Sequence, residues 1–271
     1  MDARLQRRVQ RYGWDKAADF YEQYWASQLE LAQNRMLAAA ALSPGTRVLD
    51  VACGTGLVTF RAAAAVGPGG YVLATDISEA MVQQIGATAA ARGLTHVTAE
   101  RCEAEALRVD EAAFDAALCA LGLMYVTDPD QALRHMHRAL RAGGRVALAV
   151  WGARAQCGWA EIFPIVERRV ASEVCPLFFQ LGTGEALRYA LTSAGFTNID
   201  VERVSTTLDY DSAEAACGAA FAGGPVALAY SRFDPTTRDA AHAEYLDSIA
   251  IHRRGSGYAI PGEFVVASAV K

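Results

Sequence analysis

Two acidic residues and a run of small residues form the pattern in this chain that most strongly suggests chemistry. Asp50 opens the run, which ends at Gly56, and Asp76 follows 26 residues after Asp50. Small residues let a ligand approach the backbone, and Gly54 and Gly56 can adopt positive φ. A carboxylate at position 50 disfavours a diphosphate and favours a cation, while one at position 76 can accept hydrogen bonds from both ribose hydroxyls. The pattern therefore predicts a site for a positively charged nucleoside cofactor.

A dinucleotide site is the alternative for the same turn. Its fingerprint is G-x-G-x-x-G, with an acid about 20 residues further on for the ribose. Here Gly54-x-Gly56 is followed by Val58, Thr59 and Phe60, so the third glycine is missing. The turn thus fits a cationic cofactor better than a nicotinamide dinucleotide.

The elements that must position this turn can be read from apolar runs and their punctuation. Apolar residues recur at helical spacing over 15–42, and short apolar runs alternate with helical patterns from residue 47 to 151. Such alternation predicts a parallel sheet covered on both faces, with ligands beyond the carboxyl ends of its strands. The expected strands are 47–51, 71–75, 97–100, 114–119, 145–151, 198–210 and 262–270. The expected helices are 15–42, 57–66, 79–93, 128–140, 159–172, 185–194, 213–222 and 236–251.

Several motifs in chain order resemble those of a known family. They are Asp50-x-Ala52-Cys53-Gly54-Thr55-Gly56, Asp76-Ile77-Ser78-x-x-Met81, Cys102-Glu103-Ala104-Glu105, Ala120-x-Gly122-Leu123 and Leu140-Arg141-Ala142-Gly143-Gly144-Arg145. Together they resemble the S-adenosylmethionine site of class I methyltransferases, and more closely the UbiE-like branch. The resemblance covers residues 15–151 well and the remainder in outline. Ala52 and Cys102 each stand where the family commonly has Gly, and Glu103 where it has Asp.

The resemblance implies a fold and a division of the chain. The expected fold is α/β, a Rossmann-like doubly wound sheet of seven strands, mostly parallel with an antiparallel last strand. Residues 1–43 would form an N-terminal helical cover, 44–210 and 255–271 the cofactor-binding domain, and 211–254 a helical cap. The cap carries Phe221, Tyr230, Phe233, Tyr245 and Ile249, which could line an acceptor pocket or form plain helical core.

The resemblance also implies site residues. The expected cofactor-binding residues are Tyr24, Asp50, Ala52, Cys53, Gly54, Thr55, Gly56, Asp76, Ile77, Ser78, Met81, Cys102, Glu103, Ala104, Ala120 and Leu121. Substitution of Gly56 by Val is expected to block the cofactor while leaving folding largely intact. Leu123 and Trp151 are candidates for substrate binding, and Tyr21, Tyr125 and His242 for catalysis. Methyl transfer is an in-line displacement, so a general base is required only if the acceptor must lose a proton early.

Composition narrows the class further. Hydrophobic residues make up 52% and charged residues 20%, which excludes intrinsic disorder. The net charge of −5 weighs against a nucleic-acid partner. With no apolar leader and no run near 20 apolar residues, we expect no membrane span and a cytoplasmic protein with reduced cysteines.

The expected function is methylation, at oxygen or carbon, of a small aromatic, quinone-like or polyketide-type acceptor. S-adenosylmethionine is the expected cofactor, no metal is expected, and a homodimer is left open. A nicotinamide-dependent oxidoreductase and a non-catalytic S-adenosylmethionine binder are the alternatives.

Overall fold

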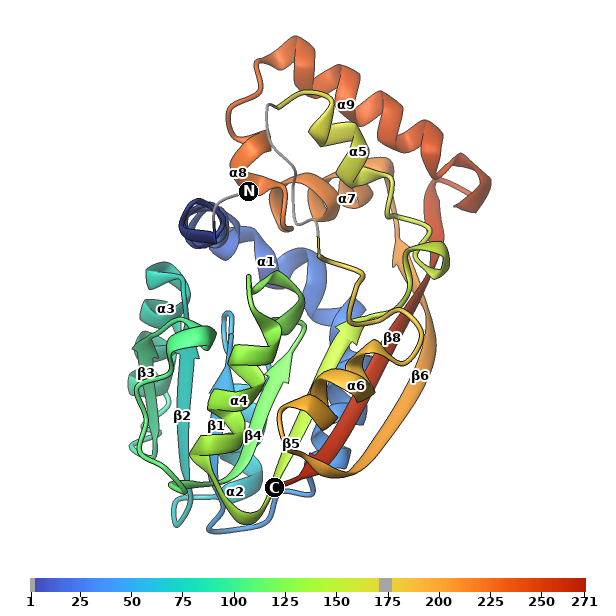
Figure 1. The fold of residues 1–271 in the computed structure, drawn as a ribbon. Helices are drawn as coiled ribbons and strands as arrows, with labels where there is room; N and C mark the ends of the chain where they lie inside the picture. Colours follow the sequence, from blue (N-terminus) through green and yellow to red (C-terminus); the bar gives the residue numbers. More distant parts are fainter. Residues whose placement is uncertain (1–2, 171–176) are drawn as a thin grey trace.

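A computed structural model describes residues 3–170 and 177–271 of the chain. In these residues one sheet of eight strands runs through the molecule, in the order β3-β2-β1-β4-β5-β8-β6, with β7 pairing with β8 (Figure 1). The strands are β1 Arg47–Val51, β2 Tyr71–Asp76, β3 Val97–Arg101, β4 Phe114–Ala120, β5 Leu140–Trp151, β6 Thr197–Tyr210, β7 Arg253–Arg254 and β8 Gly257–Val270.

The direction of the strands follows the expectation. Pairs β1–β2, β1–β4, β2–β3 and β4–β5 are parallel, whereas β8 is antiparallel to both β5 and β6. The predicted Rossmann-like α/β fold with an antiparallel last strand is therefore confirmed. The eighth strand, β7, is a two-residue extension that the sequence pattern does not reveal.

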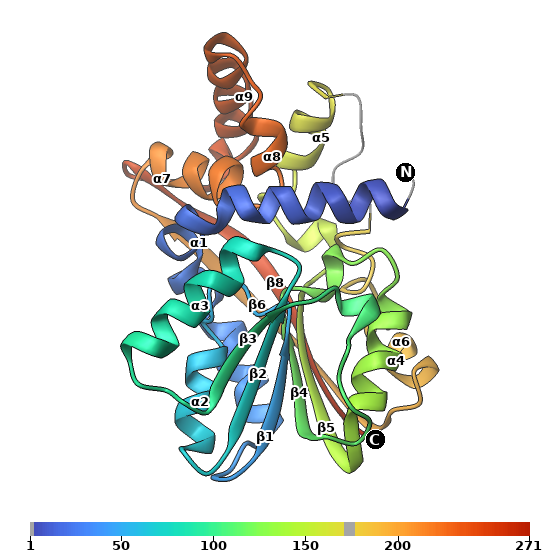
Figure 2. The same cartoon turned by 90° about the vertical axis from the view of Figure 1, so that its left-hand side faces the viewer.

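Helices cover both faces of the sheet, as Figure 2 shows with the sheet seen edge-on. The helices of the first 140 residues are α1 Ala3–Ala40, α2 Thr59–Val66, α3 Glu79–Ala91 and α4 Pro129–Ala139. α2 and α3 lie on one face, and α4 lies on the other with α6 (Ala186–Ser193). This layering makes the inner strands apolar on both sides: four of the five residues of β1 are buried.

The N-terminal helix α1 is longer than predicted. Its first half lies across the carboxyl edge of the sheet, and its second half runs down one face (Figures 1 and 2). Leu29 and Met36 of its apolar stripe are buried, but Phe20 is 44% exposed, so the stripe is narrower than the sequence suggests. The helix therefore covers the place where the strands end.

A helical cap stands above the same edge of the sheet (Figure 1). It contains α7 Ala213–Cys217, a π-helical turn Gly218–Ala222, α8 Ala227–Tyr230, α9 Pro235–Ser248 and a short 3-10 helix Ala250–His252. α5 (Ile162–Glu167) packs against α9, and Arg169 forms an ion pair with Glu244 at 2.8 Å. Short 3-10 turns at Ala104–Ala106, Leu123–Tyr125 and Arg154–Gln156 complete the described elements.

One sequence expectation differs from the structure in this half, and one open alternative is narrowed. The helix expected at 159–172 is shortened to α5, and its last two positions lie outside the described residues. Of the two alternatives for the cap's apolar residues, helical core is favoured, because Phe221, Tyr245 and Ile249 are each at most 2% exposed. Among residues 3–170 and 177–271, no helix combines the length and apolar character needed to cross a membrane.

Candidate active site

A hollow of about 710 Å³, partly open to solvent, lies at the carboxyl edge of the sheet beneath α1. It contains much of the sequence-predicted cofactor set. The predicted residues that line it are Tyr21, Ala52, Gly54, Asp76, Ile77, Met81, Cys102, Ala104, Ala120, Leu121 and Tyr125.

Asp76 is the last residue of β2, and backbone amides hold its carboxylate in place. The Gly54 N–H donates to Oδ2 and the Ser78 N–H donates to Oδ1, both at 2.9 Å. Burial raises the pKa of this carboxyl, and the hydrogen bonds from Ser78 and Gly54 oppose the rise. Each carboxylate oxygen accepts more than one hydrogen bond, so Asp76 retains capacity for ligand hydroxyls.

Asp50 lies one residue before the end of β1 and is 1% exposed. Thr59 Oγ1 donates to Asp50 Oδ2 at 2.6 Å, whereas the buried Oδ1 has no partner among the described residues. Burial raises the pKa of Asp50 to about 7, although the Thr59 hydrogen bond opposes this. An unpartnered buried carboxylate oxygen is costly, so this donor set fits a cationic group.

A smaller hollow of about 280 Å³ surrounds Asp50 and adjoins the first hollow through Tyr21, Ala52, Gly54 and Ala120. The predicted residue Cys53 also lines it. Burial raises the pKa of the Cys53 thiol well above its usual value and that of Cys119 to about 12. Both thiols therefore stay protonated and have little nucleophilic character.

The two glycines of the turn differ in what a side chain would meet. At Gly54 (φ +56°) an added Cβ would have only Tyr21 near it, at 3.9 Å, so this residue faces open space. At Gly56 (φ +96°) it would lie 2.6 Å from the Phe60 ring and 3.1 Å from Ile85. The expectation that Gly56→Val blocks the cofactor and spares folding is therefore wrong, because Gly56 faces the protein's own packing.

Ala52 and Leu121 carry backbone strain beside the hollows. Both have positive φ, of 54° and 60°, which non-glycine residues rarely adopt. The resembling family commonly has Gly at the position of Ala52. The left-handed backbone that the turn requires there explains this preference. Such outliers cluster at binding sites, where surrounding structure holds them.

Only part of the segment expected beside the adenine base lines the main hollow. Cys102 and Ala104 line the main hollow, but Glu103 does not and instead pairs with Arg7 at 3.4 Å. Glu105 lines the hollow although it was not predicted to. Its buried carboxylate accepts hydrogen bonds from the Thr127 N–H at 2.8 Å and from Thr127 Oγ1 at 2.6 Å.

Several other predicted residues do not line the main hollow. Ser78 caps α3, where its Oγ accepts from the Met81 N–H at 3.2 Å. Thr55 is buried, and its hydroxyl has no partner among the described residues. Tyr24 packs against Gly218 of the cap and lines none of these hollows, and Leu123 is 1% exposed beneath them.

Sequence reasoning missed the contribution of the first turns of α1. Arg7, Gln10 and Trp14 line the main hollow together with Tyr21. The signal was present, because positions 7, 14 and 21 continue one helical face upstream of the expected start at residue 15. That start was placed too late because the polar residues around Arg7 hide the apolar stripe.

A third hollow, of about 330 Å³, adjoins the main one through Trp14, Tyr21, Leu121 and Tyr125. Trp151 lines it, at the end of β5 as the sequence predicts. Its remaining lining residues are Trp25, Leu29, Trp159, Phe178, Gly223, Gly224 and Pro225. We call this third hollow the aromatic chamber.

The three residues predicted to be catalytic fall in different places. Tyr21 and Tyr125 border both the main hollow and the aromatic chamber. Burial first, and then the charges of Asp76 and Glu22, raise the pKa of Tyr21, so its hydroxyl stays protonated. His242 lines none of the three hollows: it lies in the cap with its Nε2 3.0 Å from the Tyr230 hydroxyl.

Comparison with known proteins agrees with this arrangement. Residues 48–144 match the family described as "Methyltransferase domain". The chain is 28% identical over 256 residues to nocamycin O-methyltransferase of Saccharothrix syringae, covering 89% of this chain and 91% of that protein. It is 43% identical over 107 residues to the ubiquinone/menaquinone biosynthesis C-methyltransferase UbiE of Hahella chejuensis.

The solved structures support the fold. A Haemonchus contortus phosphoethanolamine N-methyltransferase 2, solved with phosphomonomethylethanolamine and S-adenosylhomocysteine, superposes with a TM-score of 0.62 at 18% identity. That match covers 95% of this chain and 57% of the solved chain.

Together the fold, the turn and the matched domain define a class I S-adenosylmethionine-dependent methyltransferase. Within that class the chain resembles UbiE over part of its length. The match to UbiE spans 38% of this chain and 41% of UbiE, so it covers less than half of either protein.

Proposed function

We propose that this protein transfers a methyl group from S-adenosylmethionine to a small acceptor that binds in the aromatic chamber. The observation that carries the proposal is the unpartnered, buried Oδ1 of Asp50 beside the glycine turn. A buried carboxylate without a partner is explained by a cationic ligand, and the cofactor carries both an ammonium and a sulfonium group.

The chain's residues suit the parts of that cofactor. Asp50 would hold the ammonium group, Asp76 the ribose hydroxyls, and Ile77, Met81 and Ala104 the face and edge of the base. When bound, the cofactor supplies a methyl group that is already electrophilic. The protein then has to align the acceptor and exclude water, and α1 with the cap covers the site for this purpose.

The position of the aromatic chamber supports its role as the acceptor site. It shares Tyr21 and Leu121 with the main hollow, so a molecule in the chamber would adjoin the cofactor. Tyr21 keeps its proton and could orient an acceptor oxygen by donating a hydrogen bond, which makes it a better donor than base. We retain Tyr125 as a second candidate for this contact, and 211–254 as the proposed cap.

Calorimetry with S-adenosylhomocysteine and with NAD tests the cofactor assignment. The thioether should bind, and NAD should not compete with it. Mass spectrometry of a panel of phenols, hydroxyquinones and aromatic acids incubated with S-adenosylmethionine then tests transfer by a gain of one methylene. Binding of NAD without a response to S-adenosylhomocysteine would overturn the proposal.

A further inference from the structure

Two tryptophans of the aromatic chamber have buried indole N–H groups without a hydrogen-bond partner among the described residues. Trp25 is 7% exposed and Trp159 is 5% exposed, and each Nε1 lacks an acceptor. Buried donors in folded proteins are nearly always satisfied, and each unsatisfied one costs about 1–3 kcal/mol. Both side chains border the same hollow, so its occupant is the natural source of the missing acceptors.

The geometry around Trp25 supports this. A Cβ built on Gly223 would lie 3.4 Å from Trp25 Nε1, and Gly223 itself lines the chamber. The indole N–H edge of Trp25 therefore lies against Gly223 of the chamber wall, where any residue larger than glycine would press on the indole. The Trp159 ring packs edge-to-face on Phe178, with centroids 5.6 Å apart, and lies 5.0 Å from the Trp151 ring.

Among the described residues that line the chamber there is no carboxylate, imidazole, thiol or amine that could remove a proton. Among its described lining residues the ionisable side chains are Tyr21 and Tyr125, and none is Asp, Glu, His, Cys, Lys or Arg. Tyr21 is buried in an acidic neighbourhood and keeps its proton. The acceptor must therefore arrive already able to attack.

We propose that the aromatic chamber selects planar oxygen acids, which enter as oxyanions and are oriented by the indole N–H groups of Trp25 and Trp159. Aromatic carboxylates, hydroxyquinones and the enols of 1,3-dicarbonyl compounds share this chemistry. The aromatic walls match a flat ring, and the two donors match the lone pairs of a charged oxygen. This inference rests on the proposed function and names its acceptor class.

The transfer balances without any proton movement. A lone pair of the acceptor oxyanion forms the new oxygen–carbon bond while the carbon–sulfur bond of the cofactor breaks, and its electron pair stays on sulfur. An anion and a cation become a neutral ester or ether and a neutral thioether. Because charge disappears along this path, an apolar chamber that excludes water favours the transition state.

Binding of 2-naphthoate and of its neutral isostere 2-naphthamide, measured by calorimetry on protein saturated with S-adenosylhomocysteine, tests the inference. We expect the anion to bind at least about tenfold tighter than the amide, since hydrogen bonds to charged groups are the stronger ones. Trp25→Phe and Trp159→Phe keep the aromatic surface and remove the donor. Each should lower the ratio of anion to amide affinity by about tenfold.

Trp151→Phe is the matched control, because its indole lines the same wall and is not one of the two unpartnered donors. A loss of packing alone lowers both affinities and leaves the ratio unchanged, as we expect for this variant. Equal binding of acid and amide, binding of neither, or a ratio unaffected in both Trp25→Phe and Trp159→Phe would overturn the inference. Failure of S-adenosylhomocysteine to bind would instead overturn the proposed function.

Discussion

Gly54 and Gly56 stand two residues apart in one turn, yet the protein uses them differently. Both have positive φ, but a side chain at Gly56 meets Phe60 and Ile85, whereas a side chain at Gly54 meets mostly open space. Gly56 is therefore required for close packing of the turn against Phe60 and Ile85, whereas Gly54 leaves space for a ligand. Spacing in the sequence cannot separate these two needs, because both appear as a glycine.

Substituting each glycine by alanine should separate them experimentally. Gly56→Ala should lower the free energy of unfolding by about 1–3 kcal/mol through overpacking and strain, while its folded fraction still binds S-adenosylhomocysteine. Gly54→Ala should weaken that binding beyond its own cost in stability, because the new methyl group occupies ligand space. Urea unfolding and calorimetry measure the two quantities, and the opposite pattern would show that the assignments are reversed.

Asp76 offers a second prediction at this scale. Asp76→Ala should weaken S-adenosylhomocysteine binding by about 1–3 kcal/mol, the usual effect of losing hydrogen bonds to a charged group. It should also lower stability, since the Gly54 and Ser78 amides lose their acceptor. Asp76→Asn, which retains one carbonyl oxygen, serves as the comparison and should lie between wild type and Asp76→Ala. An unchanged dissociation constant for the alanine variant would mean that the ribose lies elsewhere.

At the scale of elements, α1 is fastened over the site at two points. Asp15 Oδ1 accepts from Ser78 Oγ at 2.6 Å and from the Ala80 N–H at 3.3 Å, at the start of α3. Arg7 donates to Thr127 Oγ1 at 3.2 Å and pairs with Glu103. A cofactor beneath this helix would leave more easily if these contacts opened, so we expect them to lengthen its residence time.

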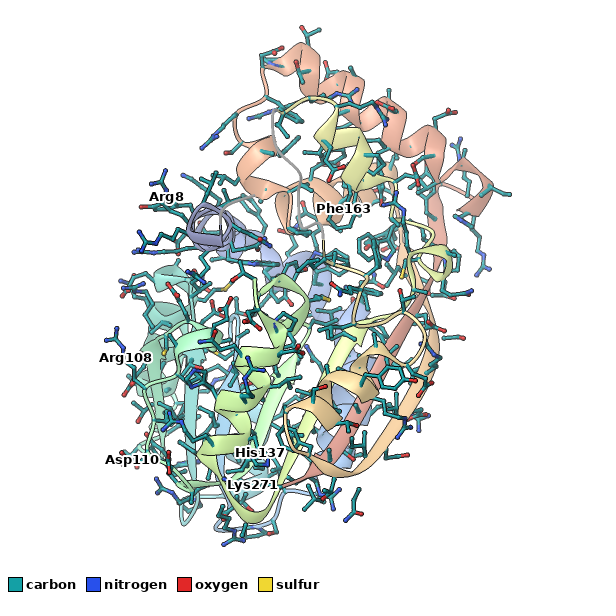
Figure 3. All side chains as sticks on the ribbon, viewed as in Figure 1. Arg8, Arg108, Asp110, His137, Phe163 and Lys271 are labelled. Carbon is teal, nitrogen blue, oxygen red and sulfur yellow. The ribbon has the colours of Figure 1, made fainter. Side chains whose placement is uncertain are left out.

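Loosening these contacts should speed cofactor release. We expect Asp15→Ala and Arg7→Ala each to raise the dissociation rate of S-adenosylhomocysteine by about threefold to tenfold, as loss of one or two such hydrogen bonds implies. Stopped-flow displacement measures this rate. Arg8→Ala is the control, because Arg8 is exposed and points away from the body of the molecule in Figure 3. An unchanged rate in both tether variants would show that α1 is not the barrier.

Local pattern predicts the elements of this protein far better than it predicts the acceptor chamber. The strand Arg47–Val51 and its turn follow from a short apolar run and small residues, and the structure has the same strand bounds. Trp159 and Phe178, in contrast, share the chamber with Trp25 only through tertiary packing, because Trp25 lies more than 100 residues away in the sequence. The role of the cap's apolar residues stays open in the sequence for the same reason, since composition does not tell which apolar face turns inward.

For the whole molecule, the carboxyl edge of the sheet concentrates acids where a cation is to bind. Asp50 and Asp76 are both buried, and burial raises the pKa of each carboxyl. The charge of Asp76 raises the pKa of Asp50 further, and the charge of Asp15 raises that of Asp76. A carboxyl whose folded pKa is raised binds protons more tightly than in the unfolded chain. Its ionisation therefore lowers stability as pH rises from about 4 towards the folded value of about 7 for Asp50.

Ionised Asp50 should therefore lower the stability of the ligand-free protein and strengthen the binding of a cation, and both effects should depend on pH. Asp50→Asn removes the buried charge but keeps an oxygen that can accept the hydrogen bond from Thr59. Without ligand, the free energy of unfolding of the variant should therefore be higher than that of wild type by on the order of a few kcal/mol at pH 8, and the difference should be much smaller at pH 5. Its affinity for S-adenosylhomocysteine should fall by about tenfold or more, because the ammonium group loses its counter-charge. In wild type, binding at pH 6 should release close to one proton, since the cation favours ionised Asp50.

Thermal unfolding between pH 5 and 8, with calorimetry in buffers of different ionisation enthalpy, measures all three effects. Asp110→Asn is the matched control, because Asp110 (labelled in Figure 3) is exposed and lines none of the three hollows, so its loss should leave the pH dependence unchanged. A ligand-free Asp50→Asn protein that is less stable than wild type at pH 8, or binding at pH 6 without proton release, would contradict a buried carboxylate kept for a cation. If all three effects are observed, the ligand-free protein is less stable than it could be, and cofactor binding restores that stability. The lifetime of the folded enzyme then depends on the concentration of its cofactor.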